Sequence, residues 1–323
     1  MNEVFYQIFF AFTLDLMIAD PVFLPHPVRI IGFLIAKFEG VLRRFFKGKP
    51  EFAGGVILTL AVTIPSYFFV NYLLIFADGV SGYLSIIIGT YFIYASIACR
   101  ELAERANDVL KRLKKGELEE ARRYLSGLVG RDTQGLDDEG IKRAVIETVA
   151  ENINDAVVAP LFYAFLGGAP LAFTYRVVNT LDSMVGYRNE KYAKFGFASA
   201  KLDDILNFIP ARLVGLLFPV VAFILKKDVR GCVDAMRRDA RKHLSPNSGI
   251  SEAAMAGALG VRLGGLSFYE GRAVSRSEMG KPIRSLTNDR VSEAIKIHYM
   301  ISALALTSLS LINLIFHWRG VRF

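Results

Sequence analysis

The sequence contains few of the residues that build metal centres and disulfide frameworks: two cysteines and four histidines among 323 residues. Cys99 and Cys232 lack the paired spacing of zinc ligands, and we expect both to be buried as small apolar side chains. A disulfide between them is the alternative. The histidines are scattered and form no HExxH pair, which excludes the helical zinc-protease motif. Only His26 stands within a motif, and we interpret the other three as packing or surface residues.

The phosphate-binding loop of many nucleotide-binding proteins is also missing. Gly280 and Lys281 are followed by Pro282 and lack the required preceding glycine, so no Walker A motif is formed. A Ser-His-Asp triad has no support beyond the presence of the three residue types. Any nucleotide chemistry in this chain therefore uses another arrangement.

Charge is absent from several long stretches, which excludes an ordinary soluble protein. Residues 54–77, 79–99 and 299–316 carry no charged side chain, and each is long enough to form a spanning helix. Residues 4–19 and 205–225 are weaker candidates, because they carry polar side chains (Asp15, and Asn207 with Arg212). Residues 4–19 lack the flanking signals of a cleaved signal peptide, so we interpret them as a retained first helix.

A sixth apolar stretch, residues 156–175, is interrupted by Pro160 and by the Gly-Gly-Ala-Pro sequence at 167–170. Such breaks in a membrane are tolerated where other helices or a wet cavity satisfy the backbone. We therefore predict an all-α fold, a polytopic transmembrane helical protein with broken or re-entrant segments and cytoplasmic helical connections. It would form a single integral-membrane domain over 1–323, with a polar helical hairpin at 100–130 and a polar connection at 226–297.

The net charge of +8 comes mainly from basic residues in the connections between apolar runs. The positive-inside rule places such connections in the cytoplasm, and it accounts for the charge without nucleic acid. If residues 156–175 and 205–225 both cross the membrane, the polar segment between them lies outside, apart from the other polar segments. We prefer four full spans with these two segments irregular, and six full spans is the alternative.

Carboxylates gather where a polar segment enters the sixth apolar run. On a helix running from about 138 toward 165, Glu147, Glu151 and Asp155 lie four residues apart and share one face, with Thr148 and Asn152 beside them. Ionisable groups at membrane depth are functional candidates. Either basic side chains pair with this stripe or a hard cation such as Mg²⁺ binds it. The alternative is a solvated helix end at the membrane surface.

Further polar residues follow the broken run. Arginine and lysine among them can bind phosphate, and the carboxylates can bind metal. The glycines of residues 245–265 favour either close helix packing or the approach of backbone to a bulky ligand. The candidate residues in these segments are Asn179, Asp182, Ser183, Arg188, Lys191, Asp203, Asp204, Arg212 and Asn247.

Six motifs, in this order, resemble the CbiB/CobD family of cobalamin biosynthesis. They are DP-x-x-x-PHPV (20–28), GRDT (130–133), ETVAENINDAVVAPLFYAFLGGAP (from 147), VNTLDSMVGYRNEKY (from 178), ASAKLDDILNFIPARL (from 198) and SPNSG-x-x-EAAMAGALGVRLGG (245–265). The resemblance runs from about residue 14 to about residue 271, most of the chain.

The resemblance implies an integral-membrane adenosylcobinamide-phosphate synthase. Such an enzyme joins adenosylcobyric acid to aminopropanol or its phosphate by ATP-dependent amide ligation, through an acyl phosphate. It implies ATP and Mg²⁺ as cofactors, the corrinoid and the amine as substrates, membrane lipid as surroundings, and contact with other cobalamin-assembly enzymes. A polytopic membrane transporter with an intramembrane carboxylate site is the main alternative, and a membrane phosphotransferase is a second.

With these roles in view, we assign the candidate residues as follows. Catalytic roles fall to Glu147, Glu151, Asp182 and Lys191. Cofactor-binding roles fall to Asn152, Asn179, Ser183, Arg188, Arg212 and Asn247. Metal-binding roles fall to Glu151, Asp155, Asp203 and Asp204.

Overall fold

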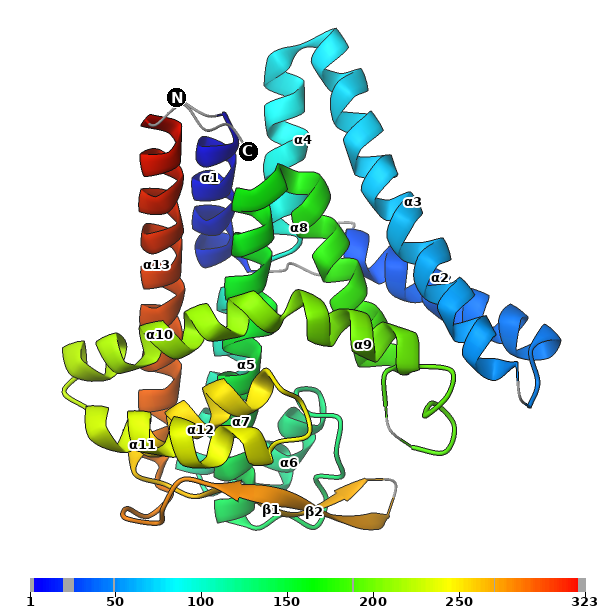
Figure 1. Ribbon diagram of the computed structural model, residues 1–323. Coiled ribbons are helices and arrows are strands. Elements are labelled where there is room, and N and C mark those ends of the chain that lie inside the picture. The colour runs from blue at the N-terminus through cyan, green and yellow to red at the C-terminus, as the bar shows by residue number, and fades with distance from the viewer. Residues whose placement is uncertain (1–2, 20–25, 49, 188, 270, 319–323) are drawn as a thin grey trace. The chain divides into compact units, whose positions relative to one another are not determined.

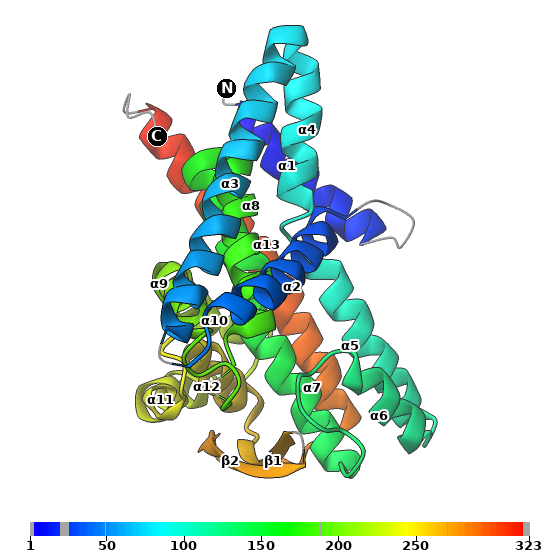
Figure 2. The ribbon, with the colours of Figure 1, turned by 90° about the vertical axis from the view of Figure 1, so that its right-hand side faces the viewer.

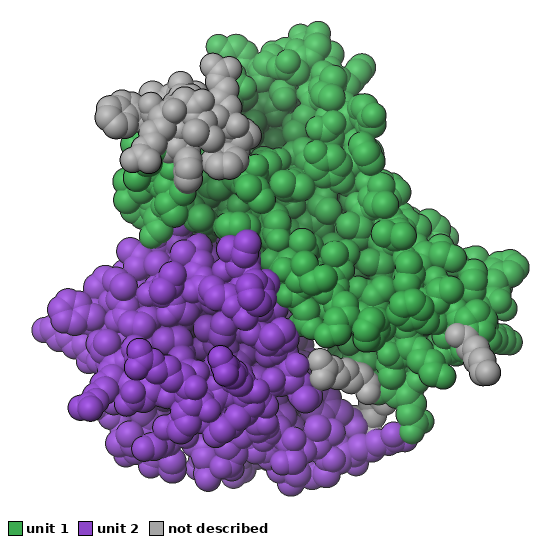
Figure 3. Space-filling view, viewed as in Figure 1, with its two compact units in different colours: residues 1–98, 159–207, 306–323 green, residues 99–158, 208–305 purple. Residues whose placement is uncertain are grey.

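The computed structural model describes residues 3–19, 26–48, 50–187, 189–269 and 271–318. Helices dominate these ranges, as the sequence predicts, and the chain divides into two compact units. Unit 1 comprises residues 1–98, 159–207 and 306–323, and unit 2 comprises residues 99–158 and 208–305 (Figure 3). The single integral-membrane domain stays a prediction.

Unit 1 contains α1 (Glu3–Ile18), α2 (Pro27–Phe45), α3 (Glu51–Val80), α4 (Gly82–Tyr94), α8 (Ala159–Val185) and α9 (Phe197–Leu206). α3 and α4 form a hairpin joined at Ser81, and α8 packs against both (Figure 1). α2 is inclined to α3 in both ribbon views (Figures 1 and 2). The kink in α8 falls at Gly167 and Gly168, where Gly168 has a φ of 66° that favours glycine. The sequence predicted this break.

Unit 2 contains α5 (Cys99–Lys114), α6 (Leu118–Ser126), α7 (Asp138–Ile153), the π-helix η1 (Asn154–Val158), α10 (Phe208–Ile224), α11 (Val229–Asp239), the 3₁₀ turn η2 (Ala240–Lys242) and α12 (Ser248–Leu259). α13 (Asn288–Trp318) begins in unit 2 and ends in unit 1. The core of unit 2 is built from α5, α7, α10, α12 and α13. α5 and α6 form the polar helical hairpin that the sequence predicts.

The connection at 226–297 holds a feature that was not expected. β1 (Leu263–Tyr269) and β2 (Arg272–Met279) form an antiparallel hairpin, whose register shifts between Leu263 and Gly265. Gly271, with a φ of 75°, lies in the tight connection between the strands. β2 is largely exposed and polar, so hydrophobic periodicity did not reveal it.

Among the described residues, four helical stretches are long and apolar enough to cross a membrane: 51–80, 82–114, 138–185 and 288–315. α9 and α10 form a pair bent by 46°, either a broken span or a re-entrant loop, which raises the count to five. The multi-pass prediction is therefore confirmed by length and composition. These candidate spans differ from the expected ones in two ways. α1 has only 16 residues and is not among them. The apolar run that is broken at Gly167 is among them, as part of one long stretch with α7.

Candidate functional site

The candidate site lies in unit 2 and is built around α7. The side chain of Asp137 caps this helix by accepting a 2.7 Å hydrogen bond from the Gly140 amide. Acidic residues occupy its first turn, as the helix dipole favours. Most of the residues that follow are buried, and most of these are apolar. The helix thereby carries Glu147 into the interior, where only 1% of the residue is exposed.

Three donors hold the Glu147 carboxylate. Arg131 donates to its Oε2 at 2.5 Å and Arg276 to the same oxygen at 3.0 Å, while the Gly264 amide donates to Oε1 at 2.6 Å. These donors come from the loop after α6, from β2 and from β1. A buried carboxylate is stable only when paired and hydrogen-bonded, and here it ties three segments together. The sequence left two ways to neutralise the carboxylates of α7, pairing with basic side chains or binding of a cation. For Glu147 the structure shows pairing with basic side chains.

Arg276 also reaches a second buried carboxylate. Its other terminal nitrogen donates to Glu252 Oε1 at 3.0 Å, and His243 Nε2 lies 3.4 Å from that oxygen. Burial raises the pKa of Glu252 well above its ordinary value, although Arg276 opposes this effect. Burial lowers the pKa of His243. Burial alone would lower the pKa of Arg276, but the carboxylates of Glu252 and Glu147 raise it.

A polar pocket of about 120 Å³ opens beside these charged residues. We call them the charged cluster: Arg131, Glu147, His243, Glu252 and Arg276. Glu151 lies one turn beyond Glu147, and no donor to its carboxylate is found within the described ranges. The pocket thus presents two carboxylates, of Glu147 and Glu151, next to two guanidinium groups, and the arginines donate to Glu147. Its lining residues are Leu128, Val129, Gly130, Arg131, Glu147, Thr148, Glu151, Asn152, Tyr269 and Arg276.

Six predicted site residues belong to unit 2. Glu147, Glu151 and Asn152 line the polar pocket together, whereas Asp155 does not and instead accepts a 2.8 Å hydrogen bond from Asn154. The reason is local, since the α-helix changes to the wider π-helix η1 at residue 154 and the four-residue spacing no longer holds. The remaining two residues, Arg212 and Asn247, contact each other, because Arg212 donates a 2.7 Å hydrogen bond to the Asn247 side chain.

The other predicted site residues belong to unit 1, except Arg188, which lies outside the described residues. Asn179, Asp182 and Ser183 share the last turns of α8, where Ser183 donates to the Asn179 carbonyl at 2.9 Å. Lys191 is exposed, and its ammonium lies 3.9 Å from Glu39 and 4.5 Å from the Tyr192 ring centre.

The four predicted metal ligands are divided between the units, with Glu151 and Asp155 in unit 2 and Asp203 and Asp204 in unit 1. Asp203 accepts a 2.9 Å hydrogen bond from Asn207. Lys201 lies 3.4 Å from Asp204. Within the described part of the chain, no group of three or more His, Cys, Asp or Glu side chains is placed to hold a metal ion. Any Mg²⁺ would depend on substrate oxygens for part of its coordination.

Four residues of the charged cluster were not among the predicted site residues. Arg131 and Glu252 lie within motifs GRDT and SPNSG-x-x-EAAM, so the motifs contained the signal. His243 was interpreted as a packing or surface residue, and that interpretation misses its contact with Glu252. Arg276 lies outside every motif, and nothing in the local sequence of β2 distinguishes it from its neighbours.

The glycines of α12 serve helix packing. A Cβ on Gly257 would lie 2.1 Å from the Gly231 carbonyl oxygen, so α11 and α12 pack backbone to backbone at this point. This contact favours close packing over ligand approach for Gly257. Cys99 and Cys232 are both buried and free, as expected, and no disulfide joins them.

Comparison with known proteins extends these findings to the whole chain. The family model for the CobD/CbiB protein matches residues 8–298. The cobalamin biosynthesis protein CobD of Clostridium perfringens is 42% identical over 306 residues, covering 93% of this chain and 95% of that protein. CobD of Geobacter metallireducens is 44% identical over 299 residues, covering 93% of each.

The cobalamin biosynthesis protein CbiB of Salmonella typhimurium is 41% identical over 300 residues, covering 93% of this chain and 94% of that protein. No solved structure gives a significant match. The resemblance carried by the six motifs thus extends along nearly the full length of several relatives. The chain belongs to the CobD/CbiB family of cobalamin biosynthesis proteins.

Proposed function

We propose that this protein catalyses an ATP-dependent amide ligation, in which adenosylcobyric acid is joined to aminopropanol or aminopropanol phosphate. Family membership supports a role in cobalamin biosynthesis. The observation that carries the chemical proposal is the polar pocket, where Glu151 lies beside Arg131 and Arg276. A carboxylate next to two fixed guanidinium groups suits a reaction between an anionic group and an amine.

The proposed reaction has two balanced steps. The propionate oxygen of the corrinoid attacks the γ-phosphorus of ATP, which forms an acyl phosphate and releases ADP. The amine nitrogen then attacks the acyl carbon, the C–O bond to phosphate breaks, and the amine gives up a proton. The second step needs an acceptor for this proton and donors for the departing phosphate.

The roles of the pocket residues follow from their contacts. Arg131 and Arg276 are assigned the anionic group through their positive charge, because their terminal nitrogens already donate to Ser267, Glu147 and Glu252. Glu151 is assigned the reacting ammonium or its proton, since its carboxylate borders the pocket. Glu147 already accepts from three donors, so we revise its assignment from catalytic residue to positioning residue for the two arginines.

The size of the pocket limits what it holds. Sites for whole small molecules usually measure about 300–1,000 Å³, and this pocket has about 120 Å³. It therefore fits a phosphate group or a small amine rather than a nucleotide or a corrinoid. If Mg²⁺ takes part, Glu151 and Asn152 are the pocket residues that would hold it, as the alternative to the ammonium role of Glu151, and the ion would neutralise phosphate charge.

Mass spectrometry of the purified protein with ATP, Mg²⁺, a cobyric acid and aminopropanol phosphate tests the proposal. The expected result is a corrinoid product whose mass has increased by that of the amine less water. Glu151→Gln should lower turnover at least about 100-fold, in the range of a lost general base. Glu139→Gln is the matched control, because Glu139 lies on the exposed face of the same helix. No product with the unmodified protein would contradict the proposal.

The transporter alternative rests on the kink of α8 at Gly167 and Gly168, since broken helices also form transport sites. It predicts corrinoid flux into sealed vesicles without any product of increased mass.

We further propose that the pocket faces the cytoplasm, where ATP is found. Because Cys99 and Cys232 are buried, a single introduced Ser126→Cys should react with an impermeant maleimide only from the cytoplasmic side.

A further inference from the structure

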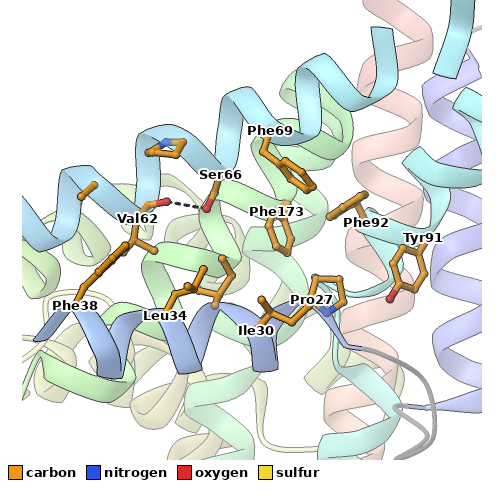
Figure 4. Close-up of a pocket in the computed structure, with 13 residues that line it drawn as sticks. Pro27, Ile30, Leu34, Phe38, Val62, Ser66, Phe69, Tyr91, Phe92 and Phe173 are labelled. Atoms are coloured by element: carbon orange, nitrogen blue, oxygen red, sulfur yellow. Dashed lines mark hydrogen bonds between the residues drawn. The ribbon is translucent and has the colours of Figure 1, made fainter. Parts of the chain in front are cut away.

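A second cavity, of about 650 Å³, lies entirely within unit 1 between α2, α3, α4 and α8 (Figure 4). Its walls are almost wholly apolar, and the Ser66 hydroxyl among them already donates to the Val62 carbonyl at 2.7 Å. The walls therefore offer little to bind the amides of a corrinoid or the phosphates of a nucleotide. The lining residues are Pro27, Ile30, Ile31, Leu34, Phe38, Ala61, Val62, Pro65, Ser66, Phe69, Tyr91, Phe92 and Phe173.

The cavity opens through exposed apolar side chains. Ile30 of α2 is 58% exposed and Phe69 of α3 is 60% exposed. α3 is one of the helices that are long and apolar enough to cross a membrane. Apolar side chains on such a helix are stable when they face hydrocarbon, so this opening is suited to lipid rather than to water.

α2 has an apolar face that is bordered by basic side chains. Ile30, Leu34 and Phe38 recur at helical spacing and line the cavity, as Figure 4 shows for all three. Lys37, seven residues after Ile30, and Arg44, seven residues after Lys37, are exposed along the edge of this apolar face. Basic side chains that border the apolar face of a helix at a membrane interface reach the lipid headgroups with their charged ends.

The positive charge along this edge is available to a ligand. Arg43 is committed within the protein, because it donates to Glu39 at 2.8 Å and to the Lys191 carbonyl at 2.9 Å. Lys37 and Arg44, in contrast, form no ion pair with any residue in the described ranges. The Lys37 ammonium lies over the Phe33 ring, 4.7 Å from its centre.

We propose that unit 1 binds one anionic phospholipid, with an acyl chain in the 650 Å³ cavity and the headgroup phosphate at Lys37 and Arg44 of α2. Three observations support this occupant: an apolar wall, an opening beside a candidate membrane span, and uncommitted cations at the edge of the same helix. Anionic lipids are attracted to such basic segments at the cytoplasmic leaflet. The inference does not depend on the proposed ligation, because no residue of the polar pocket takes part.

Quenching by brominated lipids tests this site in the full-length protein. Phe69→Trp in a Trp318→Phe background places one reporter in the cavity, and vesicles contain either dibrominated phosphatidylglycerol or dibrominated phosphatidylcholine at equal bromine content. We expect phosphatidylglycerol to associate with this reporter several-fold more strongly. Lys37→Gln and Arg44→Gln should each reduce the preference by up to about fivefold, the effect of one basic residue near a charged membrane surface.

Ile87→Trp in the same background is the matched control. Ile87 is 65% exposed and lines another apolar cavity, formed by α1 and α4, which adjoins the first at Tyr91. Its quenching should be equal for the two lipids. If phosphatidylglycerol and phosphatidylcholine associate equally with the Phe69→Trp reporter, the proposal is overturned. It is also overturned if both reporters prefer phosphatidylglycerol to the same extent, because this indicates general enrichment of anionic lipid around the protein. Absence of lipid quenching at Phe69→Trp would also overturn it, since another part of the protein would then cover the cavity.

Discussion

Arg276 donates a 3.0 Å hydrogen bond to the carboxylate of Glu147, although 129 positions of sequence separate the two residues. The contact joins β2 to the middle of α7. Because the Glu147 carboxylate is almost fully buried, its charge depends on this partner and on Arg131. The same contact fixes one of the two guanidinium groups that border the polar pocket.

The first prediction separates the two glutamates of α7. Glu147→Gln leaves two largely buried guanidinium groups without their shared anion, so it should lower the unfolding free energy by about 3 kcal/mol. Glu151→Gln should change stability by less than about 1 kcal/mol and lower activity far more. Thermal unfolding and ligation assays on the same detergent-purified samples measure both effects. Equal stability losses in the two variants would contradict the division of roles.

The second prediction concerns Asp239, the buried carboxylate at the end of α11, which accepts a hydrogen bond from the amide of Gly280 just after β2. Burial alone would raise its pKa, but hydrogen bonds from Arg238, Lys242 and the Gly280 amide lower the pKa of Asp239 to about 2. A carboxyl with a lowered pKa contributes stability above its unfolded value of 3.8, and loses it as pH falls toward 2. Asp239→Asn should therefore cost about 1–2 kcal/mol at pH 7, since Arg238 and Lys242 are partly screened by water.

Melting temperatures of the protein and of Asp239→Asn between pH 7 and pH 2 measure this effect. The difference between them should shrink as the pH falls below about 4. Asp234→Asn, an exposed position on α11, should leave the melting temperature within about a degree at every pH. A constant difference across the whole range would show that Asp239 acts through packing rather than through its charge.

The third prediction concerns Asp182, which lies one turn after Asn179 on α8. If this turn contacts the nucleotide or its metal, Asp182→Asn should impair ATP-dependent turnover while corrinoid binding stays nearly intact. Corrinoid affinity and turnover are measured on one preparation, with Glu190→Gln as an exposed control nearby. Loss of corrinoid affinity with normal use of ATP would exclude this role. Loss of both with a lower melting temperature would make Asp182 a structural residue.

The fourth prediction tests the contact between α11 and α12. Gly257→Ala places a Cβ 2.1 Å from the Gly231 carbonyl oxygen, so the helices must separate, at a cost of at least about 2 kcal/mol. Gly40→Ala on α2 is the control, because no atom lies within 4 Å of its new Cβ. That change should be neutral or stabilising by about 0.5–1 kcal/mol. Differential scanning fluorimetry in detergent compares the two.

The sequence predicts those parts of the fold that depend on local pattern. The apolar runs give α3, α4 and α13, and glycine followed by proline marks the kink of α8. The wider turn of η1 was not expected, because no residue type specifies a π-helix. The hairpin of β1 and β2 was missed for a different reason: it is stabilised partly by Glu147, which contacts it from a distant helix.

For the site, the sequence identifies the carboxylates but not what neutralises them. Spacing along α7 is enough to bring Glu147 and Glu151 to one face, and both line the pocket. The partners Arg131 and Arg276 come from a loop and a strand, and their approach is a property of the folded chain. Metal and nucleotide roles for the remaining candidates stay predictions.

The long separation between Glu147 and its partners has a consequence for biosynthesis. Chains grow at about 5–20 residues per second, so β2 is made roughly 6–26 s after Glu147. Until β1 is made, Arg131 is the only one of the three donors to Glu147 that already exists, because Gly264 belongs to β1 and Arg276 to β2. α7 therefore reaches its final burial only after the hairpin is synthesised, and a chain truncated before β2 exposes an incompletely paired carboxylate to the cell's quality control.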